Sequence, residues 1–190
     1  HGWHDWYIAS TERDAGVPDF NSELIYTVKY NDFDTVAKLV AEEKNNIAAL
    51  IMEPCGAVAP NKGYLENIRE LTEKTEIILI FDELFTGFRW SLGGAQEYFG
   101  VTPDLACFGK AMANGMPISC IVGKKSLMEC FESVFFSFTY GDETLSLAAT
   151  LATLRKLQQN NIYTKLEESG KYLQDGIVEL IKKHRLQDFL

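Results

Sequence analysis

Short apolar runs alternate with longer amphipathic stretches along most of the chain. The apolar runs are nearly continuous, as expected for strands covered by helices on both faces, and they span residues 47–52, 77–81, 105–108 and 118–122. Helical patterns accompany them at 33–43, 64–73 and 126–132, and Asp32 is a candidate N-cap for the first of these helices. The alternation predicts β-α units that build an α/β fold with a mostly parallel sheet.

The last part of the chain has the pattern of two helices. After Thr144, leucines recur at spacings of three and four residues, and a second helical stretch covers 162–183, with Asn160-Asn161 as the predicted break. We therefore expect residues 1–160 to form part of a sheet domain and residues 161–190 to form a helix that leads toward a further domain. Because the chain lacks a start methionine and stops directly after a helical pattern, we expect it to be a piece of a longer protein.

Composition and charge disfavour several classes of protein. The 190 residues are 46% apolar, which is enough to bury the core of one compact domain. The formal net charge of −9 disfavours nucleic acids and anionic membranes as partners, because both require clustered Lys and Arg. The longest apolar run, 77–81, is too short to cross a bilayer, and the N-terminus lacks a signal-peptide pattern. We expect a cytoplasmic protein.

The four cysteines lie in apolar stretches and include no C-x-x-C pair; they are Cys55, Cys107, Cys120 and Cys130. This pattern is typical of reduced core residues in a cytosolic protein and does not indicate a disulfide framework. A zinc site is the alternative interpretation.

Charged residues follow three of the predicted strands directly. Glu53 closes the first, Asp82-Glu83 closes the second, and Gly109-Lys110 closes the third. In an open parallel sheet the carboxyl ends of the strands meet at one edge, where ligands bind. Two acidic positions and a lysine are therefore expected to converge there, although any one charge after a strand can simply be a solvated loop residue.

The residue types at this edge limit the possible chemistry. Asp82-Glu83 could hold a metal, but the three histidines, His1, His4 and His184, lie far from it in the sequence. A nucleotide-binding P-loop does not fit, because Ala111 follows the lysine where Ser or Thr is required. A buried carboxylate near a lysine suits a cofactor that has a basic ring nitrogen and an aldehyde, and pyridoxal phosphate (PLP) is such a cofactor.

An ordered series of motifs matches one family. The chain resembles the class III PLP-dependent aminotransferases, and among them glutamate-1-semialdehyde aminomutase and its relatives. The resemblance is strongest between residues 47 and 122, and it rests on the motifs Asp82-Glu83-Leu84-Phe85-Thr86-Gly87-Phe88-Arg89, Leu92-Gly93-Gly94-Ala95-Gln96, Gly100-Val101-Thr102-Pro103-Asp104-Leu105, Phe108-Gly109-Lys110 and Gly115-Met116-Pro117. It implies a three-layer α/β/α fold like the large domain of fold-type I PLP enzymes.

The resemblance also implies roles for individual residues. Lys110 matches the lysine that forms the Schiff base with PLP and later moves a proton as a base. Asp82 matches the aspartate that pairs with the pyridine nitrogen, and Leu84 matches an aliphatic residue packed on the ring. Thr139 matches a threonine that reaches the cofactor phosphate of the neighbouring subunit, which implies a homodimer with shared sites. Glu53 matches a glutamate near the cofactor.

Two segments depart from the family pattern. Many members have a glutamine that bonds the ring hydroxyl, and this chain has Phe85 at that position. Aminomutase relatives also lack that glutamine. After Gly141 the common Gly-Asn-Pro is replaced by Asp142-Glu143-Thr144, which changes the charge near the phosphate end. Glu143 either faces the site or caps the helix that follows it.

Parts of the family's site are expected outside this chain. The aromatic residue that stacks on the PLP ring precedes the family's His-Gly, represented here by His1-Gly2, and a Gly/Ser-Thr phosphate loop lies further upstream. A small C-terminal domain is expected beyond Leu190. The sequence therefore predicts a PLP-dependent aminotransferase or aminomutase that acts on a small-molecule amino donor and a carbonyl acceptor. The alternative is a non-catalytic fragment that associates with itself and does not bind PLP productively.

Overall fold

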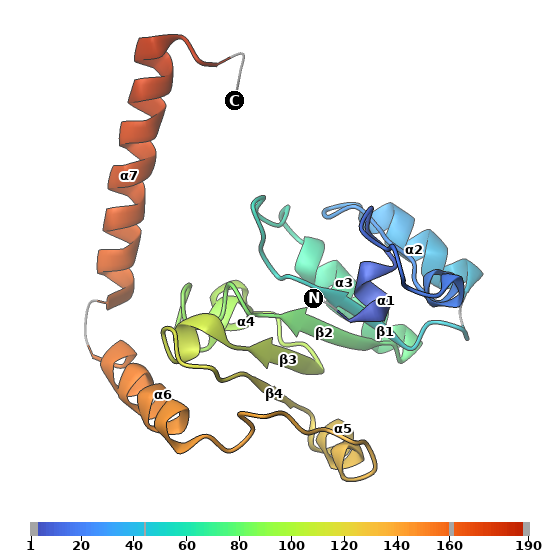
Figure 1. Ribbon diagram of the computed structural model, residues 1–190. Coiled ribbons are helices and arrows are strands. Elements are labelled where there is room, and N and C mark those ends of the chain that lie inside the picture. Colours follow the sequence, from blue (N-terminus) through green and yellow to red (C-terminus); the bar gives the residue numbers. More distant parts are fainter. Residues whose placement is uncertain (1–3, 44, 160–161, 188–190) are drawn as a thin grey trace.

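A four-stranded sheet forms the centre of the chain (Figure 1). The structure is a computed structural model, and it describes residues 4–43, 45–159 and 162–187. The strands are β1 (Ala49–Met52), β2 (Ile78–Asp82), β3 (Leu105–Phe108) and β4 (Cys120–Gly123), hydrogen-bonded in the order β1-β2-β3-β4. All four coincide with predicted apolar runs. The predicted α/β class, a mostly parallel sheet with helices on both sides, is confirmed.

The first three strands run parallel, and the fourth reverses direction. In register, Met52 pairs with Phe81 and Asp82 pairs with Cys107, so the carboxyl ends of β1, β2 and β3 lie at one edge. β4 pairs with β3 antiparallel, with Phe108 opposite Cys120. The connection between β3 and β4 contains only one short 3-10 helix, η2 (Lys110–Met112). It is too short for the crossover that a parallel pairing requires, so β4 returns antiparallel.

Two amphipathic helices cover one face of the sheet. α2 (Phe33–Glu42) packs against α3 (Tyr64–Thr75), and α3 packs against β2. The predicted cap is confirmed, since Asp32 accepts a hydrogen bond from Thr35 N at 3.1 Å. Their apolar stripes bury a cluster with alternate residues of β2, in which Ile68, Leu79 and Phe81 have no exposed surface.

The opposite face of the sheet is only partly covered. Ile51, Ile78 and Ile80 are half-buried, whereas their strand neighbours Leu79 and Phe81 on the first face are fully buried. Because side chains alternate along a strand, this difference separates the two faces cleanly.

Short helices not expected from the sequence connect the main elements. They are α1 (Asp5–Ile8), η1 (Asp19–Leu24) and α4 (Gly94–Phe99). The predicted helix at 126–132 is split into α5 (Lys125–Met128) and η3 (Glu129–Glu132). Segments of four to six residues are too short for the 3.6-residue apolar period to identify them.

Two helices end the chain, as predicted. α6 (Thr144–Leu157) begins at Glu143, whose side chain accepts from the amides of Leu145 and Ser146, so the capping interpretation of Glu143 is confirmed. α7 (Ile162–His184) extends away from the sheet and has no buried residue (Figure 1). The predicted break at Asn160-Asn161 lies outside the described residues.

The described ranges hold neither a membrane-spanning helix nor a cluster of metal-binding side chains. No helix there is long and apolar enough to cross a membrane. No group of three or more His, Cys, Asp or Glu side chains in those residues is arranged to hold a metal ion. The four cysteines are free.

Candidate functional site

The carboxyl ends of the three parallel strands place the predicted residues at one edge of the sheet. Asp82 is the last residue of β2, Glu53 directly follows β1, and Lys110 stands two positions beyond β3. Glu83 N donates to Cys107 O at 2.9 Å, which extends the β2-β3 pairing up to this edge. The sequence prediction that these strand ends share one edge is therefore confirmed.

Lys110 has an unusual backbone conformation. Its φ of 44° lies in the left-handed region, which costs a non-glycine residue about 1 kcal/mol or more. The conformation is held by η2, because the amides of Ala113 and Asn114 both donate to the Lys110 carbonyl. The side chain is exposed, and its Nζ lies 4.0 Å from the centroid of the Phe85 ring. The amine is thus fixed at its base and accessible at its tip.

The residue before the lysine is a glycine that lies close to Leu84. A Cβ on Gly109 would lie 2.7 Å from Leu84 Cδ2, so glycine allows the Leu84 side chain to approach the backbone that carries Lys110. Leu84 is held in turn by its amide, which donates to Asp82 Oδ1 at 3.0 Å. The loops after β2 and β3 therefore bring Leu84, Asp82 and the base of Lys110 close together.

The two adjacent acids after β2 have different environments. Glu83 is fully buried, and its carboxylate accepts from Thr86 Oγ1 at 2.6 Å and from the amides of Ala95 and Gln96, both at 2.8 Å. Gly94, at φ 81°, has no room for a Cβ because the Glu83 carboxylate occupies that space. Glu83 therefore holds the start of α4 in place, and the metal-pair interpretation of Asp82-Glu83 has no support in the described residues.

Asp82 is buried at the edge itself, with 4% of its surface exposed. Burial raises the pKa of the neighbouring Cys107 thiol, and the Asp82 carboxylate raises it further. Cys107 therefore stays a neutral thiol beside this carboxylate and does not compete with the lysine as a nucleophile.

Glu53 begins a loop that two side chains hold in place. Tyr30 Oη donates to Pro54 O at 2.7 Å, and burial raises the pKa of Tyr30, so that its hydroxyl stays protonated as a donor. Asn31 donates to Ala59 O at 3.0 Å and accepts from Asn61 N at 2.8 Å. This bracing keeps the loop after β1 at the carboxyl edge. The role of Glu53 itself stays a prediction.

Thr139 lies on a separate element from the other predicted residues. It is exposed in the loop between η3 and α6, and this loop also exposes Phe135 (94%), Phe136 (52%) and Phe138 (60%). The rings of Phe136 and Phe138 stack edge to face, with their centroids 4.7 Å apart. The described part of the chain shows no hydrogen bond between Thr139 and Lys110.

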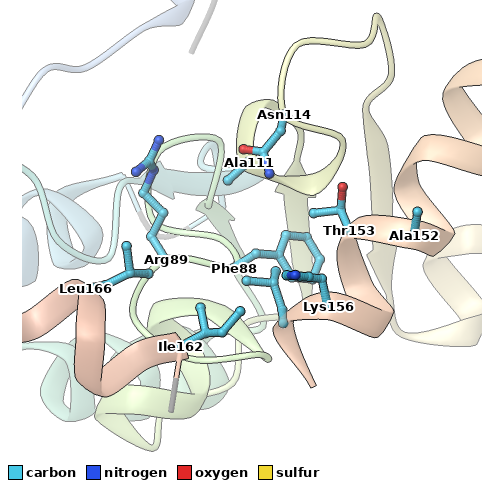
Figure 2. Close-up of a pocket in the computed structure, with 10 residues that line it drawn as sticks. Phe88, Arg89, Ala111, Asn114, Ala152, Thr153, Lys156, Ile162 and Leu166 are labelled. Atoms are coloured by element: carbon cyan, nitrogen blue, oxygen red, sulfur yellow. The ribbon is translucent and has the colours of Figure 1, made fainter. Parts of the chain in front are cut away.

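A pocket of about 470 Å³ opens beside η2 (Figure 2). Phe88 lies near its centre, with residues of α6 on one side and Ile162 and Leu166 of α7 on the other. Ala111, the residue after Lys110, also lines it, whereas Lys110 and Asp82 do not. The pocket was not expected from the sequence, because its walls come from four separate segments.

Comparison with known proteins identifies the family. The model of the class-III aminotransferases matches residues 9–189. The chain belongs to this family. The match includes all three strand ends described above, together with the whole of α6 and α7.

Individual relatives agree with this assignment. The chain is 38% identical over 203 residues to glutamate-1-semialdehyde 2,1-aminomutase of Methanocaldococcus jannaschii, covering 98% of this chain and 47% of the relative. An omega-transaminase from Sphaerobacter thermophilus superposes with a TM-score of 0.87 at 25% identity, covering 96% of this chain and 47% of that one. A glutamate-1-semialdehyde aminomutase from Pseudomonas aeruginosa PAO1 in complex with PMP gives 0.71 at 26% identity, covering 84% and 37%. The chain spans about half the length of the curated relatives it matches.

The donor set at the carboxyl edge fits the family's cofactor. PLP presents an aldehyde, a basic ring nitrogen and a flat apolar ring. The chain offers an exposed amine at Lys110, a buried carboxylate at Asp82 and an aliphatic side chain at Leu84. Each group of the cofactor that these residues would meet therefore has a chemically matched partner at the carboxyl ends of β2 and β3.

Proposed function

We propose that this chain forms part of the cofactor-binding domain of a PLP-dependent aminotransferase or aminomutase, with Lys110 as the residue that carries PLP. One observation supports the assignment most strongly. In a chain of the class-III family, a strained and exposed lysine lies two positions beyond β3, and a buried aspartate ends the adjacent parallel strand β2.

Three residues would hold the cofactor. Lys110 Nζ would bond to the aldehyde carbon, the Asp82 carboxylate would keep the ring nitrogen protonated, and Leu84 would pack on one face of the ring. When bound, PLP supplies an electron sink for a substrate carbon that loses a proton. Once released by the incoming substrate amine, Lys110 Nζ would move a proton at that carbon. The neutral Cys107 thiol takes no part.

The substrates we propose are a small-molecule amino donor and a carbonyl acceptor. An aminotransferase moves the amino group between two molecules, whereas an aminomutase moves it within one. The similarity to an aminomutase and to an omega-transaminase supports both. Glu143 does not distinguish them, because its carboxylate is engaged with the amides at the start of α6.

We also propose a homodimer in which Thr139 reaches the partner's site. The exposed aromatic loop that carries Thr139 supports this, because Phe135 is 94% exposed and large apolar groups are seldom left uncovered in this way. Burial of this loop against a second copy would bring Thr139 to the edge of the partner's sheet.

The assignment of Lys110 can be tested by adding PLP to the purified chain. We expect a visible absorbance band from the attached cofactor in the wild type and in Lys171→Ala, and no such band in Lys110→Ala. Lys171 is a suitable control because it is also an exposed lysine but lies on α7. If Lys110→Ala and the wild type give the same spectrum, the assignment is wrong. If none of the three binds PLP, the alternative of a non-catalytic, self-associating fragment gains support.

A further inference from the structure

Phe85 is an exposed aromatic residue at the carboxyl edge. Its side chain is 61% exposed, although the turn that carries it is tightly built. Gly87 N donates to Glu83 O at 2.7 Å, and the buried Glu83 carboxylate is held by Thr86, Ala95 and Gln96. The backbone that carries the Phe85 ring is therefore held at the edge of the site.

The Lys110 ammonium lies over the Phe85 ring. Nζ is 4.0 Å from the ring centroid, well within the roughly 6 Å over which a cation is attracted to the face of an aromatic ring. The base of the lysine is fixed as well, because the η2 turn holds its backbone at φ 44°. The backbones that carry both partners of the contact are thus held by hydrogen bonds.

We propose that Phe85 is a positioning residue that holds the Lys110 amine on the ring face, so that attachment to an aldehyde requires the amine to leave the ring. In that step the ammonium gives a proton to solvent and the nitrogen lone pair bonds to the aldehyde carbon. The aldehyde oxygen then leaves as water. A charged amine bound to the ring has no lone pair for this attack, so Phe85 restrains the reaction.

The contribution of such a contact at an exposed site corresponds to about a two- to fivefold change in an equilibrium or rate. Phe85→Leu removes the ring but keeps an apolar side chain, and Phe85→Trp strengthens the attraction. Lys110 should therefore react with aldehydes about two- to fivefold faster in Phe85→Leu than in the wild type, and more slowly in Phe85→Trp.

Reductive methylation of the full chain tests this inference without the cofactor. Formaldehyde condenses with a lysine amine, and cyanoborohydride supplies the hydride that reduces the carbon-nitrogen double bond. Peptide mass spectrometry then gives the rate at Lys110 relative to the exposed Lys171 on α7 in the same sample. Equal relative rates in all three proteins, or a slower Lys110 in Phe85→Leu, would overturn the inference.

The inference rests on the proposed role of Lys110, and a second measurement separates the two. PLP is added to the same three proteins and its attachment is followed by absorbance. If PLP attaches but methylation does not depend on residue 85, the role of Phe85 is wrong and the proposed function stands. If methylation follows the order Leu, Phe, Trp but PLP never attaches, the contact exists and the alternative of a fragment that does not bind PLP productively gains support.

Discussion

The charged residues at the two edges of the sheet differ in burial and in their polar partners. At the amino edge, the buried Asp104 carboxylate accepts from Leu79 N at 2.8 Å, Arg69 Nη1 at 3.0 Å and Lys124 Nζ at 2.5 Å. At the carboxyl edge, the exposed Lys110 has no ion pair with any residue in the described ranges and has a strained backbone. A charge beside a strand is therefore not diagnostic by itself, whereas an unpaired charge on a strained backbone indicates a site.

Glu83 sharpens this comparison, because it lies at the carboxyl edge but is bonded like Asp104. Glu83→Ala leaves Thr86 Oγ1 and the amides of Ala95 and Gln96 without their acceptor, so we expect a loss of about 4 kcal/mol in the free energy of unfolding. Urea denaturation measures this. The control is Glu66→Ala on the exposed face of α3, expected within about 0.5 kcal/mol of the wild type. Equal losses in both variants would contradict a structural role for Glu83.

Asp104 should show a somewhat smaller effect that depends on pH. Burial by itself would raise the pKa of Asp104, but the hydrogen bonds from Lys124, Leu79 and Arg69 outweigh it and hold the pKa below its ordinary value. Asp104→Asn keeps the bond to Leu79 N but leaves Arg69 without a charged partner there, so we expect a loss of about 3 kcal/mol near neutral pH.

The pH dependence of this loss has a definite sign. A carboxylate whose pKa is lowered by folding stabilises the folded state fully above its unfolded pKa, about 3.9 for Asp, and this stabilisation disappears as the pH falls through the folded value. The difference between the wild type and Asp104→Asn should therefore be constant down to about pH 4 and then shrink. A difference that grows in acid would contradict the assignment of Asp104 as the stabilising anion.

Gly109 should have a small effect on folding and a larger effect on the site. The added methyl of Gly109→Ala would lie 2.7 Å from Leu84 Cδ2, which is the tip of a flexible side chain that can move aside for less than about 1 kcal/mol. The displaced Leu84 loses apolar contact with the cofactor ring, so we expect about tenfold weaker PLP binding. A PLP titration measures this, with Leu84→Ala as the reference. An unchanged affinity in both variants would exclude Leu84 from the ring face.

Phe135 should have the smallest effect on folding. The ring is 94% exposed, so Phe135→Ser should leave the free energy of unfolding within about 0.5 kcal/mol of the wild type. If this loop forms a dimer contact, the same change should raise the dissociation constant of self-association by about tenfold or more. Sedimentation over a range of concentrations measures that constant, and identical association of both proteins would remove this loop from the interface.

The elements that were predicted correctly are those whose signals lie within short stretches of sequence. Nearly continuous apolar runs predict the strands of a mostly parallel sheet, and the four runs became β1 to β4, although one face of the sheet is only partly covered. The caps at Asp32 and Glu143 depend on residues two or three positions away, so they too could be predicted. The convergence of Asp82 and Lys110 at one edge follows from parallel strands alone.

The features that were missed depend on contacts between distant segments. Asp82 and Glu83 are adjacent acidic residues, and the sequence alone gives no reason to assign them different roles. Their environments differ because the amides at the start of α4 donate to the Glu83 carboxylate. The contact of Phe85 with Lys110 joins the loop after β2 to η2, which lies 25 residues further along the chain. The pocket beside Phe88 likewise requires α6 and α7 to be in place.

The most direct test of the central claim is the location of the cofactor on the chain. PLP is added to the wild type, the product is reduced with borohydride to make the attachment permanent, and the modified peptide is identified by mass spectrometry. The account predicts that the added mass is on Lys110, with exposed lysines such as Lys171 unmodified. Added mass spread over many lysines, or absent from Lys110, would contradict it.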